Sequence, residues 1–104
     1  MAWLWLLAAG LFEIFFAVFL KLSDGFTKPG YTILFALSAL LSFYALTKAM
    51  QIIPIGTAYA VWTGIGAVGV VVLGAILFSE PLTGMRLFFI STLIGSIIGL
   101  KFVS

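Results

Sequence analysis

Only three side chains in this sequence are acidic, namely Glu13, Asp24 and Glu80, and the chain contains no cysteine and no histidine. Thiol nucleophiles, imidazole bases and zinc sites built from cysteine or histidine are therefore excluded. No nucleophile–base pair and no metal site can be assembled from the remaining residues. We expect a protein that is not an enzyme, that uses no metal or other cofactor and that has no nucleic-acid partner. Any carboxylate chemistry must come from these three acids.

Glu13 has the most unusual surroundings of the three. It lies in the stretch LFEIFFAVFLK, residues 11–21, where every neighbour except the terminal Lys21 is apolar. A carboxyl group in such surroundings can take up a proton when it is alone and release it when a cation arrives. If the proton and the cation cannot bind at the same time and the site faces one side of the membrane at a time, the protein exchanges protons for cations. The alternative is a protonated, neutral acid that bonds to a serine or tyrosine and only fixes helix pairing.

Helical spacing gives Glu13 a set of small, hydroxyl and aromatic companions, because residues three or four apart share one face of a helix. The candidates that line the site and orient its carboxylate are Gly10, Phe16, Ser42, Tyr59, Trp62 and Thr63. A carboxylate combined with aromatic faces and hydroxyl groups suits an organic cation. For each of these residues alone, a hydroxyl bonded to its own helix or a ring in ordinary packing is an equal alternative.

The composition predicts the elements that carry these residues. Of the 104 residues, 64% are hydrophobic and 8% are charged, whereas soluble domains have about 25% charged residues. Four apolar blocks, separated by SDGFTKPG, QIIPIG and SEPLTG, predict an all-α protein that crosses a cell inner membrane several times. We expect one transmembrane domain over residues 1–104, with helices at about 3–21, 31–50, 57–79 and 85–103. No basic segment precedes the first block, so we expect it to be retained and the mature chain to begin at Met1.

The positions of the lysine and arginine residues give little information about the orientation of the chain in the membrane. With four spans, Lys21, Lys28 and Arg86 share one side, and Lys48 and Lys101 share the other with the N-terminal amine. Cytoplasmic ends usually collect the lysine and arginine residues, and here the two sides are nearly equal. Insertion in both orientations is one interpretation, and a chance balance among few charges is the other. Two inverted copies would place a pair of Glu13 side chains across one site near the midplane, as in larger transporters built from inverted repeats.

Two sets of small residues suggest roles outside the carboxylate itself. The run GIGAVG, residues 64–69, matches a dinucleotide-binding pattern, but it lies inside a long uncharged run without a preceding strand, so we reject that interpretation. Instead, Gly64, Gly66 and Gly69 are expected to let the third helix bend or to let another backbone approach closely. In the last helix, small residues repeat every four positions, which favours dimer packing, with packing inside the monomer as the alternative. These residues are Ser91, Gly95 and Gly99.

Several features together resemble the small multidrug resistance family over essentially the whole chain. They are the size, the four spans, Glu13 in the first span, the connector DGFTKPG, Ser42-Phe43-Tyr44 and PIGTAYAVWTGIGAVG at residues 54–69. Further features resemble the guanidinium-exporter subtype of that family. They are Gly10 three residues before the glutamate, WTGIG at residues 62–66, the SEPLTGMR connector and the closing GLK.

The resemblance implies an antiparallel, dual-topology homodimer that exports small cations in exchange for protons and shares two glutamates between both ligands. By position, Glu13 would bind substrate and proton, Ser42 and Trp62 would hydrogen-bond and orient the glutamates, and Tyr59 would contribute to the site and its gating. Guanidinium suits such a site because it is planar, stays charged and offers paired N–H donors to a carboxylate.

One departure from the subtype affects the expected substrate. The guanidinium subtype usually has tryptophan one turn after the glutamate, and this chain has Phe16. Loss of the indole N–H leaves Glu13 less constrained and the pocket more apolar, which leaves room for alkylated or larger guanidinyl cations. A broader exporter of quaternary ammonium and other drug cations, or one subunit of a non-identical pair, are the alternatives. A passive channel and a structural membrane subunit are hypotheses of other classes.

Overall fold

The structure is a computed structural model that describes residues 1–103. All regular secondary structure within these residues is helical. The four helices are α1 (Ala2–Leu22), α2 (Pro29–Met50), α3 (Ile55–Leu77) and α4 (Gly84–Val103). Each is long and apolar enough to cross a membrane. Even α4, which has 20 residues, rises about 30 Å, the thickness of a bilayer core. The prediction of an all-α membrane protein with four spanning helices is confirmed.

Proline and a left-handed residue determine where the helices begin and end. α2 starts at Pro29 rather than at residue 31, because a proline in the first turn gives up an N–H that has no helical partner anyway. α3 starts directly after Pro54 rather than at residue 57. It ends at Leu77 rather than at residue 79, because the backbone of Ser79 has a φ of 55°, which is outside the helical region.

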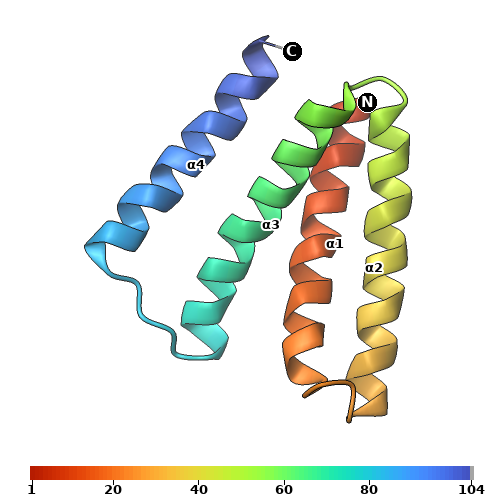
Figure 1. Ribbon diagram of the computed structural model, residues 1–104, viewed down its shortest axis with the longest axis vertical. Coiled ribbons are helices and arrows are strands. Elements are labelled where there is room, and N and C mark those ends of the chain that lie inside the picture. The colour runs from red at the N-terminus through yellow and green to blue at the C-terminus, as the bar shows by residue number, and fades with distance from the viewer. Residues whose placement is uncertain (104) are drawn as a thin grey trace.

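The helices form a flat layer with principal extents of 42 × 35 × 17 Å. Figure 1 shows their order across the layer as α4, α3, α1 and α2. α1 packs against α2 and α3, whereas the backbone of α4 comes close to α3 alone among the helices. A helix with its side chains is about 10–12 Å across, so the layer is about one and a half helix diameters thick. Its helices lie side by side rather than around a central chamber (Figure 1).

The main cluster of buried hydrophobic residues lies at one end of this layer. They belong to the first half of α1, the last turns of α2, the α2–α3 connector and the first half of α3, which meet at the end that carries the N-terminus (Figure 1). Many are small, which lets helix backbones approach closely. The cluster contains Ala2, Leu6, Ala9, Ala45, Leu46, Ala49, Ile53, Ala58, Val61 and Trp62. By contrast, α4 has no buried residue.

A tight turn and one exposed ion pair organise the opposite end. The hydroxyl of the fully buried Ser23 donates to the carbonyl oxygen of Leu20 at 2.7 Å and accepts from the N–H of Phe26 at 3.2 Å. Lys21 Nζ lies 3.7 Å from Glu80 Oε2, which links the end of α1 to the α3–α4 connector. Because both side chains are substantially exposed, this pair contributes only about 0–1 kcal/mol.

Candidate functional site

Glu13 lies at the contact between α1 and α3. Its Oε1 atom is buried and has no hydrogen-bond partner among the described residues. The space for this carboxyl comes from Gly66 on α3, where an added Cβ would overlap the Glu13 carboxyl group. A buried polar oxygen without a partner is costly in an apolar setting, and more so when it carries charge. The geometry therefore leaves an acceptor ready for a proton or a cation.

Ser42 and Trp62 form a hydrogen-bonded chain that joins three helices. Trp62 Nε1 donates to Ser42 Oγ at 2.9 Å, and Ser42 Oγ donates to the backbone carbonyl oxygen of Ala9 at 2.7 Å. Both side chains are buried. Ala9 lies one helical turn before Glu13, so the chain fixes the part of α1 that carries the carboxylate. These bonds end on Ala9 rather than on the carboxylate, and direct orientation of Glu13 by the pair stays a prediction.

Aromatic rings continue from this chain across the face of α2. The Phe16 ring lies 5.9 Å from Phe35 and 6.0 Å from Phe43, between ring centroids. Phe43 in turn lies 5.9 Å from Trp62, and Tyr59 lies 5.6 Å from Trp62. Phe35 was missed by the sequence reasoning. Its spacing could have revealed it, because it precedes Ser42 by two helical turns on the same face of α2.

Tyr59, Thr63 and Gly10 occupy different positions around this centre. The Tyr59 side chain is 56% exposed, and the Thr63 hydroxyl donates to the Tyr59 carbonyl oxygen at 2.9 Å. Thr63 thus makes the bond to its own helix that the sequence left open as an alternative. A Cβ on Gly10 would come 2.5 Å from a methyl carbon of Ile65, so Gly10 allows close packing of α1 on α3.

The three glycines of the run GIGAVG each face a neighbouring side chain. A Cβ on Gly64 would meet Ile97 on α4 at 2.7 Å, and one on Gly69 would overlap Ile14 on α1. Like the contact of Gly66 with Glu13, these are contacts with side chains. Close approach of another backbone and a bend in α3 both stay predictions, and α3 runs without interruption from Ile55 to Leu77.

The small-residue ridge of α4 faces away from the rest of the chain. Ser91, Gly95 and Gly99 are all exposed, and a Cβ on either glycine would meet nothing within 4 Å. The Ser91 hydroxyl donates to the carbonyl oxygen of Leu87 at 2.8 Å. Packing inside the monomer therefore does not explain the ridge.

Comparison with known proteins places the chain among relatives of the same length. The family model for "Small Multidrug Resistance protein" matches residues 1–93. A "Guanidinium exporter" from Yersinia pseudotuberculosis serotype I (strain IP32953) is 43% identical over 104 residues, covering 100% of both chains. A "Guanidinium exporter" from Citrobacter freundii is 44% identical over 101 residues, covering 97% of this chain and 96% of the relative.

A third relative is named as a subunit of an efflux system. The "Probable guanidinium efflux system subunit GdnD" of Bacillus licheniformis is 39% identical over 104 residues and covers 100% of both chains. The matches extend over the helices that carry Glu13, Ser42 and Trp62, and they agree with the four spanning helices of the structure. This chain is therefore a multi-pass inner-membrane protein and belongs to the small multidrug resistance family.

Proposed function

We propose that this protein is a proton-coupled antiporter that exports guanidinium or small substituted guanidinyl cations. In this proposal, two inverted copies form a homodimer, and their Glu13 side chains bind either protons or substrate. Cation and proton compete for the same carboxylates, and the site opens to one side of the membrane at a time. A proton gradient then drives the cation in the opposite direction.

The observation that carries this proposal is the unpartnered Glu13 oxygen beside Gly66. If the acid served only to pair helices, its carboxyl group should bond to a serine or tyrosine of a neighbouring helix. Instead, Glu13 Oε1 is buried with no partner, and the Ser42 hydroxyl is used by Ala9 and Trp62. An ionisable group at membrane depth that has no hydrogen-bond partner within the fold is available to bind a ligand.

The flat layer supports the pairing of two copies. The chain is 17 Å thick in its shortest dimension, and the ridge of α4 has no neighbour within the chain. A polar cation needs a chamber shielded from lipid, because an unpaired charge in hydrocarbon is costly. A second copy supplies the missing wall and a second carboxylate. The near balance of cations between the two sides of the membrane supports an inverted arrangement.

Guanidinium is the substrate class that the relatives' names support. Its planar array of N–H donors matches a carboxylate in a two-pronged hydrogen bond. Phe16 places an aromatic ring rather than an indole N–H near the site, and this ring packs against Phe35 and Phe43. An apolar wall of this kind favours substrates that carry alkyl groups besides the charged head. We therefore expect alkylguanidines to be transported as well as guanidinium.

Substrate-driven proton exchange in proteoliposomes tests this function. The protein is reconstituted with a pH-sensitive dye inside, and guanidinium, alkylguanidines and tetramethylammonium are added outside in turn. Guanidinium should drive proton movement in the wild type, and Glu13→Gln should reduce that movement to the background of empty liposomes. Glu80→Gln is the matched control, because it makes the same chemical change in an acid that is partly exposed and paired with Lys21. It should retain most of the wild-type rate.

Three results would contradict parts of the proposal. Guanidinium flux without proton movement would indicate a passive channel. Undiminished exchange by Glu13→Gln would remove the carboxylate from the mechanism. Proton exchange driven as strongly by tetramethylammonium as by guanidinium would favour a broad exporter of drug cations over the guanidinium class.

The name of the Bacillus licheniformis relative favours one second arrangement. That protein is called a subunit of an efflux system, so this chain is a candidate for one member of a non-identical pair. Such a chain should be inactive when it is reconstituted alone and should insert in one orientation only. Activity of the purified single chain supports the homodimer instead.

A further inference from the structure

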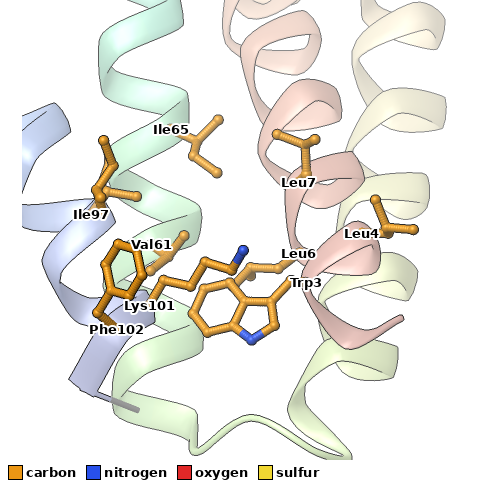
Figure 2. A pocket seen from close by; sticks show the side chains of 10 residues that line it. Trp3, Leu4, Leu6, Leu7, Val61, Ile65, Ile97, Lys101 and Phe102 are labelled. Atoms are coloured by element: carbon orange, nitrogen blue, oxygen red, sulfur yellow. The ribbon is translucent and has the colours of Figure 1, made fainter.

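An apolar groove runs between α1 and α4 over the surface of α3, at the end that carries the N-terminus. Figure 2 shows its lining, with Trp3 and Leu7 from α1, Ile65 from α3, and Lys101 and Phe102 from α4. We call it the α1–α4 groove. Its volume is about 420 Å³, within the range of about 300–1,000 Å³ that is typical of small-molecule sites. Apart from Lys101, all of its lining side chains are hydrocarbon or indole.

The groove continues toward the middle of the membrane. A second hollow of about 270 Å³ shares Ile65, Ile97 and Ile98 with the first and extends to Ile14 on α1. Along α1, the distance from Trp3 to Ile14 is about 16 Å at 1.5 Å per residue. Half of a bilayer core is about 15 Å thick. The furrow thus has the length and polarity of one lipid acyl chain, from the membrane surface to the midplane.

The outer end of the groove carries a positive charge that has no ion-pair partner within residues 1–103. Lys101 is exposed, and its Nζ atom lies 5.9 Å from the centre of the Trp3 ring. Asp24 and Glu80 lie at the opposite end of the helices, so no acid among the described residues pairs with Lys101. Tryptophan and lysine at a helix end are typical of the lipid headgroup level. A phosphate of a lipid headgroup is the complementary charge at this depth.

The groove has a different lining from the carboxylate site, because Glu13, Ser42 and Tyr59 do not border it. Its α3 residues, Val61 and Ile65, lie on a different side of that helix from Tyr59 and Thr63, which face the opposite way at 100° per residue. On α4, Lys101 lies about 160° round the helix from Gly99, whereas Ile98 lies only about 20° from Ser91. A partner packed on the ridge would therefore adjoin the groove along Ile98, on the side of α4 away from Lys101.

We propose that the α1–α4 groove binds one anionic phospholipid, with an acyl chain along Ile65 and Ile98 and the headgroup phosphate at Lys101. The apolar furrow supplies contact area for the chain, and the lysine selects for negative charge. The lipid fills the space between α4 and α1, whose backbones do not approach each other closely and whose side chains meet where Lys101 lies over Trp3. It thereby supports the position of α4, whose backbone packs against α3 alone.

Lipid titration followed by native mass spectrometry tests the site on the full chain in detergent micelles. Phosphatidylglycerol and phosphatidylcholine with matched acyl chains are the probes. The wild type should retain one phosphatidylglycerol per chain more tightly than phosphatidylcholine. Lys101→Gln should weaken phosphatidylglycerol binding on the order of fivefold, the effect of one lysine near an anionic lipid. It should leave phosphatidylcholine binding unchanged.

Lys48→Gln is the matched charge control. Lys48 is on the same side of the membrane and also lies over an aromatic ring, that of Tyr44 at 5.4 Å, but it does not line the groove. Its substitution should leave the tightly held lipid in place. Equal losses in Lys48→Gln and Lys101→Gln would show general surface attraction and overturn the proposal. Equal binding of the two lipids by the wild type would overturn it as well.

A second variant tests the apolar part of the groove. Ile98→Trp places a bulky ring in the furrow and should weaken binding of both lipids on the order of tenfold, because the ring takes the space of the acyl chain and removes its packing contacts. Leu87→Trp is the control on the same helix, at an exposed position outside the groove. If Ile98→Trp instead dissociates dimers and leaves lipid binding intact, a second copy of the chain occupies the groove and the lipid proposal fails.

Discussion

Glu13 keeps a free oxygen because position 66 has no side chain. A Cβ at Gly66 would overlap the end of the glutamate side chain, which is flexible, rather than any backbone atom. The helices can therefore stay in place if the carboxyl group moves. A small side chain at position 66 should therefore change the position of the Glu13 carboxyl group without changing how the helices fold.

Gly66→Ala should fold normally and bind substrate about tenfold more weakly, because the methyl group displaces the carboxyl group from its present position. Guanidinium affinity, measured from the concentration dependence of proton exchange, checks this. Gly56→Ala is the control on the same helix, because a Cβ there would meet nothing within 4 Å. If Gly66→Ala behaves like Gly56→Ala, the space beside the carboxylate has no functional role.

The chain from Trp62 through Ser42 to Ala9 should be measurable as an energetic coupling. Ser42→Ala leaves the Trp62 N–H without its acceptor, and Trp62→Phe removes the donor. Hydrogen bonds between membrane helices contribute about 0.6 kcal/mol on average and up to about 1.7 kcal/mol. The double variant should therefore lose about 1 kcal/mol less than the sum of the single variants. Unfolding in mixed detergent and SDS micelles measures these free energies, and additive losses would contradict the coupling.

At the scale of the helix, the sequence was sufficient for the number and type of elements. Uncharged blocks of sufficient length leave the backbone no alternative to helix in a membrane, since every N–H and C=O must be bonded internally. The ends were harder to place, because they depend on local geometry. Pro29 extends α2 backward into the connector, and the left-handed backbone of Ser79 stops α3 early. Neither effect has a hydropathy signal.

The residues of the candidate site could be predicted from the sequence, but their contacts could not. A single carboxylate in an apolar run identifies Glu13, and helical spacing brings Ser42 and Trp62 into consideration. The hydrogen-bond partners of Ser42 and Trp62 depend on how far apart the helices lie. The bond from Ser42 to the Ala9 carbonyl, and the fit of Gly10 against Ile65, arise from the close contact of α1 with its neighbours. One-dimensional spacing contains no information about that distance.

At the scale of the whole molecule, the exposed ridge of α4 predicts how the chain assembles. Gly95→Leu should leave the monomer fold intact, because a Cβ there meets nothing within 4 Å. If the ridge packs on a second copy, the larger side chain separates the helices and should raise the dissociation constant of the dimer at least about tenfold. Energy transfer between labelled copies diluted into liposomes measures this constant.

Gly84→Leu is the control for that experiment. It makes the same substitution at the start of the same helix, where a Cβ also meets nothing within 4 Å. Its dissociation constant should match the wild type. Unchanged association of Gly95→Leu would place the dimer contact on another helix, whereas equal loss in both variants would indicate general damage to α4.

The flatness of the chain has a consequence for how cells would control it. A layer 17 Å thick leaves little interior room for water and a cation, and in the proposed function the passage is assembled from two molecules. The number of working units then follows mass action within the plane of the membrane. At low abundance, export capacity would rise with nearly the square of the copy number, which makes the rate of synthesis itself a threshold switch for efflux.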